Sequence, residues 1–147
     1  MTTALVSVLG AAVLIAALMV FIRRRLSRAM EEVTLVYPEY SRLLTAPMAN
    51  FFGLRSAGMK QVRGNGILLL TADRLYFRML LPRRELTIPL DAVTSAGTVG
   101  SFLGRTKGRD LLEVDFTDEG GSEDSAAWLV GDLQEWVNGI RRSANLS

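Results

Sequence analysis

The sequence lacks the side chains on which most enzyme active sites depend. It contains no histidine and no cysteine, which removes imidazole bases, thiol nucleophiles and the usual zinc ligands. A serine nucleophile would need a lysine as its base, and the only lysines, Lys60 and Lys107, lie in predicted loops. Paired carboxylates and cofactor fingerprints are also missing. We therefore predict a non-catalytic protein without metal or cofactor, and a lipid-modifying enzyme ranks last among the functions considered.

Two other patterns have the composition of ligand sites but not the spacing. The acidic residues Asp118, Glu119, Glu123 and Asp124 lack the alternating ligand positions of a calcium loop, so we interpret them as a solvated turn. The segment Gly64-Asn65-Gly66 precedes a predicted strand where a phosphate-binding loop would precede a helix, and it has no P-loop lysine. We interpret it as a hairpin turn.

Positive charge is concentrated near the N-terminus, where Arg23, Arg24, Arg25 and Arg28 follow an apolar segment. Five of the 17 basic residues and three of the 15 acidic residues precede residue 50, so that 12 of each remain in the rest of the chain. The entire net charge of +2 therefore lies beside the apolar segment. A neutral domain does not have the basic face that nucleic-acid binding needs, and we predict no nucleic-acid partner.

The apolar segment, Ala4 to Ile22, has no charged residue. As a helix it would span about 28 Å, which is enough for one bilayer crossing. A cleavable signal peptide is the alternative, but no small-x-small cleavage site follows the segment. The arginines after it, with no basic side chain before it, predict an outside N-terminus and a cytoplasmic C-terminal domain. The same four arginines could also bind anionic lipid headgroups, which leaves two interpretations of the cluster open.

The rest of the chain divides by the period of its apolar residues. Residues 26 to 49 mix charged and apolar positions, which predicts a helical connector that breaks near Pro38, with a second short helix over Glu39 to Leu44. From about residue 50 the alternation changes to period two, which predicts antiparallel strands. The predicted strands are Phe51 to Ser56, Gly66 to Thr71, Arg74 to Leu81, Glu85 to Leu90, one within Val93 to Phe102, Leu111 to Thr117 and Ser125 to Val130.

The chain ends in an amphipathic helix. Leu133, Trp136, Val137 and Ile140 form its apolar stripe, and Asp132 is placed as the N-cap with Glu135 three residues later, in a capping-box arrangement. We predict an α+β, mainly β fold in which a transmembrane helix is followed by a seven-stranded bent sheet or barrel. The terminal helix would cap the open end of this sheet, with Trp136 in the core.

The segment GNGILLLTADRLYFRMLLPRRELTIPLDAVTSAG, residues 64 to 97, resembles the central hairpins of pleckstrin-homology (PH)-like domains of the GRAM type. In that family a strand ending in Leu-Thr leads to a strand beginning Arg-Leu-x-Phe, and the segment from Ile88 to Asp91 is similar to the next strand. The resemblance covers roughly residues 50 to 142 and implies the PH-like fold. It says little about function, because members of this fold bind phosphoinositides, other headgroups, peptides or proteins.

Family members that bind lipid commonly use basic residues of the first hairpin loop. The matching segment here is residues 55 to 63, so the resemblance implies Arg55, Lys60 and Arg63 as candidate headgroup ligands. A phosphate requires several cationic donors that converge on one point, which three basic residues on one loop could provide. A solvated loop is the alternative interpretation.

These observations predict an anchor with a basic flank (1–25), a helical connector (26–49), a PH-like domain (50–142) and a flexible tail (143–147). The predicted function is a membrane-tethered binding or scaffold module that docks a protein partner at the cytoplasmic face. The alternative is an anionic-lipid or phosphoinositide sensor that uses the first hairpin loop and the arginines beside the anchor. The sequence favours the protein partner because a tethered domain need not bind lipid to stay at the bilayer.

Overall fold

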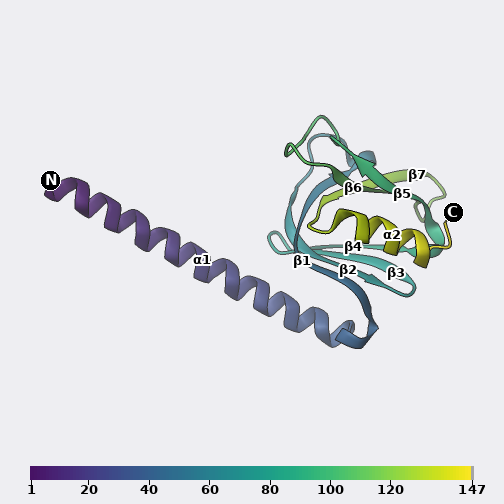
Figure 1. Cartoon of the computed structure of the whole chain (residues 1–147), viewed down its shortest axis with the longest axis horizontal. Helices are drawn as coiled ribbons and strands as arrows, with labels where there is room; N and C mark the ends of the chain where they lie inside the picture. The colour runs from purple at the N-terminus through teal and green to yellow at the C-terminus, as the bar shows by residue number, and fades with distance from the viewer. Residues whose placement is uncertain (147) are drawn as a thin grey trace.

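The computed structural model describes residues 1 to 146 as one long helix attached to a bent β-sheet (Figure 1). The helices and strands, in chain order, are α1 (Thr2–Val36), β1 (Arg42–Leu54), β2 (Gly64–Thr71), β3 (Arg74–Met79), β4 (Arg84–Pro89), β5 (Val93–Val99), β6 (Leu111–Thr117), β7 (Glu123–Leu129) and α2 (Leu133–Ser143). Short 3₁₀ turns cover Glu39–Ser41, Arg55–Ala57 and Leu90–Ala92.

All seven strands belong to one antiparallel sheet with the order β4-β3-β2-β1-β7-β6-β5. The central strand β1 pairs with β2 along most of its length and with β7 near its end. Its register shifts between Ala46 and Ala49 and again between Phe51 and Gly53, and such irregularities bend a strand. The two halves of the sheet therefore curve around one core, with α2 between them (Figure 1).

The structure confirms the α+β class, the seven strands and the terminal helix, but two local predictions are wrong. No helix covers residues 39 to 44, because a single 3₁₀ turn leads directly into β1 at Arg42. The helical part of the connector thus ends at Val36, and the sheet includes residues 42 to 49. The segment Gly64-Asn65-Gly66 is not a hairpin turn: it begins β2 and pairs with residues 49 to 51 of β1.

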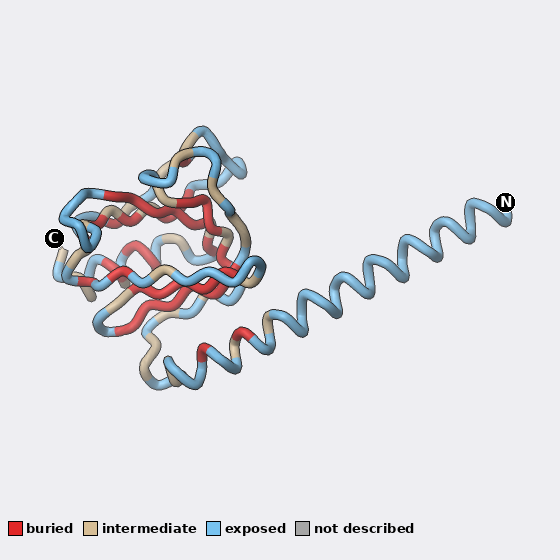
Figure 2. The backbone as a smooth tube through the Cα atoms, turned by 180° about the vertical axis from the view of Figure 1, so that it is seen from behind, coloured by how far each residue is buried: buried red, intermediate tan, exposed pale blue. Residues whose placement is uncertain are grey.

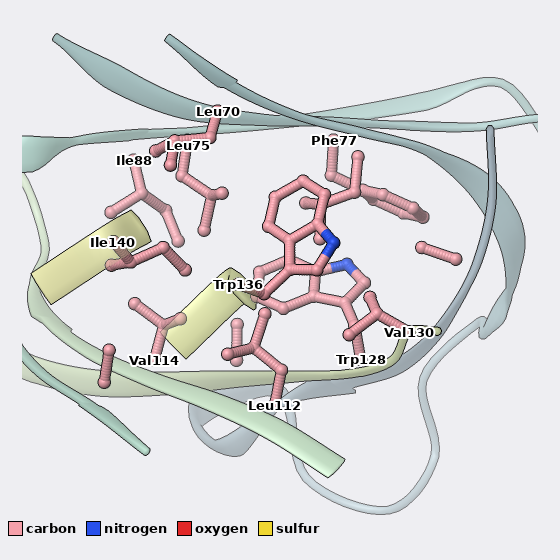
Figure 3. Packing of buried hydrophobic residues seen from close by; sticks show 14 of the residues in the cluster. Leu70, Leu75, Phe77, Ile88, Leu112, Val114, Trp128, Val130, Trp136 and Ile140 are labelled. Carbon is pink, nitrogen blue, oxygen red and sulfur yellow. The ribbon is translucent and has the colours of Figure 1, made fainter. Parts of the chain in front are cut away.

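The main core lies inside the bent sheet, where Trp128 of β7 and Trp136 of α2 lie close together (Figure 3). Trp136 is 4% exposed, as its position on the apolar stripe predicted. Asp132 precedes α2, but its carboxylate makes no capping hydrogen bond. Instead, Nε of Arg141 donates to the carbonyl oxygen of Ala96 at 2.8 Å, which ties α2 to β5.

The last described residues continue this packing. Ser143 completes α2, and Leu146 packs against the core while its backbone N–H donates to the carbonyl of Arg141. Residues 143 to 146, which were predicted to be a flexible tail, thus contact the domain. Ser147 lies outside the described residues.

Among the described residues, α1 is the one helix long and apolar enough to cross a membrane, and none of its apolar stretch is buried. Figure 2 shows that α1 is exposed along most of its length and buried only near its C-terminal end.

Candidate functional site

The C-terminal end of α1 is packed against the outer face of the sheet. Two of its residues, Ala29 and Val33, are buried there, each at most 3% exposed. They contact Ile67, Leu69 and Tyr76, which lie on the side of β2 and β3 that faces away from the main core. Because successive strand residues point to opposite faces, these side chains alternate with Leu68 and Leu70 of the main core. Helix and sheet are therefore joined by a second hydrophobic cluster.

Aromatic and polar contacts strengthen this junction. The ring centroids of Tyr37 and Tyr76 lie 4.8 Å apart, and the Tyr76 hydroxyl donates to Oε1 of Glu85 at 2.8 Å. Burial, together with the hydrogen bond to Glu85, raises the pKa of Tyr76 well above its usual value. Arg42 donates to the carbonyl of Tyr37 and to the Thr34 hydroxyl. These contacts fix the angle at which α1 leaves the domain.

Arg78 of β3 lies on the same outer face as Tyr76 and is covered by α1. It is only 7% exposed, and its Nη2 lies 2.9 Å from Oε2 of Glu32, while Nη1 donates to the carbonyl of Ala29 at 3.2 Å. Its Nε is buried without a hydrogen-bond partner among the described residues. A buried guanidinium with one unused donor is unusual, because burial of an unpaired polar group costs free energy.

The turn between β3 and β4 brings a second arginine to the same place. Nη1 of Arg83 lies 3.2 Å from Oε2 of Glu32, and its Nη2 lies 3.7 Å from Oε1 of Glu85. Three arginines of α1 line a cleft of about 490 Å³ together with these two arginines. We call it the arginine cleft; it is lined by Phe21, Arg24, Arg25, Arg28, Ala29, Glu32, Arg78, Leu80 and Arg83.

The arginine cleft has the charge of a candidate anion site. Five guanidinium groups meet one carboxylate, Glu32, so the lining carries a surplus of positive charge. Guanidinium groups bind phosphate through paired, directional hydrogen bonds, and several of them together increase affinity and selectivity. Phe21, near the end of the apolar segment, and Leu80 add apolar surface on the same cleft. The arrangement suits a ligand with an anionic group next to an apolar part.

The structure thus brings together three of the four arginines predicted to flank a membrane, namely Arg24, Arg25 and Arg28. Arg25 also lies over the Phe21 ring, with its Cζ 5.2 Å from the ring centre. Arg23 does not line the arginine cleft. It contributes instead to a shallow depression next to Val20 and Ser27.

The three loop residues implied by the family resemblance do not converge. Arg55 forms an ion pair with Glu113 at 3.0 Å and covers the Phe102 ring. Arg63 donates from Nε to the carbonyl of Phe52 at 2.6 Å and from Nη1 to a second backbone carbonyl, so that it braces the loop. Lys60 is exposed on the loop surface. Two of the three cations are therefore engaged in contacts within the domain.

Arg63 has other basic neighbours. It lines a cleft of about 500 Å³ with Arg105 and Lys107 of the β5–β6 loop. Burial, and to a lesser degree the charge of Arg105, lowers the pKa of Arg63. The β1–β2 and β5–β6 loops thus form one basic surface that is separate from the arginine cleft.

Sequence reasoning missed Arg78 and Arg83 as members of a site. Their role depends on the packing of α1 against β3, which no local pattern specifies. One signal was present: Ile67 to Leu70 form an uninterrupted apolar run, which is typical of a strand buried on both faces. A strand of this kind must be covered on its outer face as well as on the face toward the core. In the structure α1 covers the outer face of β2.

Comparisons with known proteins bear on the fold. No family model matches the sequence, and no curated protein matches it. A chain of the 8S snRNP assembly intermediate is similar in structure, with a TM-score of 0.56 and 16% sequence identity over 75% of this chain and 87% of that one. The C-terminal domain of an unknown protein from Leishmania infantum gives a TM-score of 0.53 and 12% identity over 79% of this chain and 98% of that one.

At these identities the likeness concerns the fold alone. Neither neighbour is described as a PH or GRAM domain, and neither description assigns an activity to this chain. The solved structures therefore show that the fold occurs elsewhere, and the functional argument rests on the arginine cleft.

Proposed function

We propose that this chain is a single-pass membrane protein whose PH-like domain binds the phosphate groups of anionic lipids beside its own anchor. In this proposal residues 4 to 22 cross the bilayer, the N-terminus is outside, and the domain is cytoplasmic because the arginines follow the span. The domain is a non-catalytic binding module. The order of the strands and the terminal helix support the PH-like assignment.

The observation that carries the proposal is the arginine cleft. It lies beside Phe21, so a cleft ligand would sit where the apolar part of α1 ends. In a bilayer this is the depth of the headgroup phosphates. Each basic residue near an anionic leaflet contributes about 1 kcal/mol, and several around one cleft would select lipids with more negative headgroups. Five arginines therefore favour the lipid function over the protein-docking function expected from the sequence.

Tethering makes weak intrinsic affinity sufficient. Because α1 holds the cleft at the leaflet, lipid headgroups are present around the cleft at a high local concentration. The packing of Ala29 and Val33 keeps the cleft in one orientation toward the headgroups. The cleft can thus distinguish lipids without having to recruit the domain to the membrane.

A protein partner is the second candidate function, and a separate surface favours it. Around the junction of α1 and β1, four large apolar side chains are exposed: Leu35 (85%), Val36 (69%), Tyr40 (90%) and Leu43 (56%). Contiguous exposed apolar patches are typical of protein contacts, and these four side chains lie close together in the sequence. This surface lies at the opposite end of α1 from the proposed span, so both functions are compatible.

The lipid function is tested by native mass spectrometry of the full-length chain released from nanodiscs that contain phosphatidylcholine and phosphatidylserine. We expect retained phosphatidylserine, and less of it in Arg83→Gln. A loss of about 1 kcal/mol corresponds to roughly fivefold weaker binding. Arg84→Gln is the matched control, since Arg84 is exposed, adjacent in sequence and outside the cleft. Equal retention in the two variants would contradict the lipid function.

A further inference from the structure

The inner part of the arginine cleft is occupied by a side chain of the protein itself. Oε2 of Glu32 lies 2.9 Å from Nη2 of Arg78 and 3.2 Å from Nη1 of Arg83, so one carboxylate oxygen holds two of the five arginines. Glu32 is the one acidic residue of the lining. A carboxylate binds guanidinium groups as a phosphate does, through charge-assisted hydrogen bonds. Glu32 therefore occupies positions that an anionic ligand would use.

The other three arginines of the cleft have no such partner. Among residues 1 to 146, no ion pair joins Arg24, Arg25 or Arg28 to a carboxylate. All three come from α1 and are exposed, whereas Arg78 is only 7% exposed. The cleft thus has an outer part that is open to anions and an inner part that Glu32 closes.

The contact between Glu32 and Arg78 uses only half of one guanidinium edge. Nη2 and Nε lie on the same edge of an arginine side chain, and a carboxylate or phosphate can accept from both. Arg74, on the same strand, shows the complete arrangement, because its Nε and Nη2 donate to the two oxygens of Asp73 at 3.1 and 3.0 Å. On Arg78, Glu32 contacts Nη2 alone, and Nε is buried without a hydrogen-bond partner among the described residues. A phosphate that accepts from both donors would satisfy the Nε that Glu32 leaves unpaired.

Both inner arginines are also held by groups other than Glu32. Nη1 of Arg78 donates to the carbonyl of Ala29 at 3.2 Å, and Nη2 of Arg83 lies 3.7 Å from Oε1 of Glu85, which is outside the cleft lining. The Glu32 side chain is 47% exposed, so it can turn into solvent without disturbing the packing of α1. Departure of the carboxylate would therefore leave the two arginines in place for a ligand.

We propose that Glu32 is an internal competitor of lipid phosphate: its carboxylate closes the inner part of the arginine cleft, and a headgroup phosphate displaces it to reach Arg78 and Arg83. Such competition regulates the proposed lipid function and rests on it. The apparent affinity of a ligand falls in proportion to the fraction of molecules whose site is open. An exposed ion pair at the upper end of its usual strength keeps roughly five molecules closed for each open one. Glu32 thus raises the amount of anionic lipid that is needed to fill the cleft.

A shorter side chain tests the competition without a change of charge. Glu32→Asp draws the carboxylate away from both arginines, because the packing of Ala29 and Val33 fixes the backbone of α1. In native mass spectrometry of the full-length chain from nanodiscs with phosphatidylcholine and phosphatidylserine, we expect Glu32→Asp and Glu32→Gln to bind phosphatidylserine roughly fivefold more tightly than the unmodified chain. Glu31→Asp and Glu31→Gln are the matched controls, since Glu31 is adjacent, exposed and outside the cleft lining. Both controls should bind as the unmodified chain does.

The outcomes separate competition by Glu32 from lipid binding itself. Binding by Glu32→Asp that equals that of the unmodified chain would mean that Glu32 acts through its charge alone, and weaker binding would mean that it positions the arginines. Either result overturns the competition, while the lipid function stands if Arg83→Gln retains less phosphatidylserine. If neither the unmodified chain nor the Glu32 variants retain phosphatidylserine, both proposals are overturned. Emission from the two buried tryptophans checks that each variant remains folded.

Discussion

Arg78 determines the junction between α1 and β3 at the scale of a single side chain. Buried charges are stable only when they are paired and hydrogen bonded, and Arg78 obtains this from Glu32 and the carbonyl of Ala29. The Nε atom of Arg78 has no hydrogen-bond partner among the described residues, and Arg78 also lines the arginine cleft. Arg78 therefore serves both the packing of α1 and the positive charge of the cleft.

Replacement of Arg78 by methionine should lower the free energy of unfolding by about 1 to 2 kcal/mol, because two contacts to the helix are lost. The cost is limited since Glu32 is half exposed and keeps Arg83 as a partner. Arg74→Met is the matched control on the same strand, where the exposed pair with Asp73 is worth less than about 1 kcal/mol. Denaturant unfolding in detergent, followed by tryptophan emission, measures both; equal losses would contradict a special role of Arg78.

Gly66 shows why one sequence pattern was misinterpreted. The pair of glycines in Gly64-Asn65-Gly66 has the composition of a turn, but Gly66 lies within β2 opposite Met79. A Cβ atom at Gly66 would collide with the backbone carbonyl of Arg78 and would lie 2.7 Å from the Phe77 ring. The glycine is required for the close approach of two strands.

Gly66→Ala should therefore destabilise the domain by about 3 kcal/mol, within the range observed for overpacked sites. Gly131→Ala offers a control, because its Cβ would meet no atom within 4 Å and its backbone does not require glycine. Its effect should stay within about 0.5 kcal/mol. Thermal unfolding of the two variants compares them directly, and a tolerated Gly66→Ala would show that β2 and β3 can separate at this point.

At the scale of elements, the period of apolar residues predicted most strands but not the first half of β1. Leu112, Val114 and Phe116 alternate with Glu113 and Asp115, and β6 has that pattern. Tyr40, Leu43 and Leu44 stand at a spacing typical of helices, and Pro47 argues against a strand interior. The structure places Pro47 in the irregular stretch of β1 between Ala46 and Ala49, where a strand tolerates proline. Pairing with β2 then overrides the local preference.

The site was predictable only in part for the same reason. A local pattern, an apolar run followed by basic residues, identified Arg24, Arg25 and Arg28 as residues that flank a membrane. Arg78 and Arg83 join them through tertiary packing, which a single sequence does not encode in any short motif. Two of the loop residues implied by the family resemblance, Arg55 and Arg63, instead make internal contacts, because Glu113 and the carbonyl of Phe52 lie within their reach.

The attachment of α1 is itself testable. Val33→Asp places a charge in a position that is 2% exposed, and burial of an unpaired carboxylate should release the end of α1 from the sheet. Leu35→Asp, two residues later and 85% exposed, should leave the attachment intact. Distances between spin labels at Ser27→Cys and Glu123→Cys should broaden only in the first variant. Unchanged distances in both would mean that the buried cluster does not hold the helix.

At the scale of the whole molecule, the packing of α1 against the sheet relates its apolar segment to every surface of the domain. It places the arginine cleft beside the end of the apolar segment, and Figure 1 shows the acidic β6–β7 turn near the C-terminus, away from the N-terminal half of α1. A flexible linker would allow all orientations and would make this separation of charge irrelevant. The arrangement therefore supports the proposed binding of lipid headgroups next to the apolar segment.

The most direct test of this account is the distance between lipid phosphorus and arginine side chains, measured by solid-state nuclear magnetic resonance with ¹³C at the guanidinium carbon. In bilayers containing phosphatidylserine, we predict strong dephasing of arginine signals by ³¹P, which falls in Arg83→Gln and in Arg28→Gln. Arg84→Gln serves again as the control. Dephasing that is equally strong in all three variants, or absent from the unmodified chain, would contradict binding of a lipid phosphate in the arginine cleft.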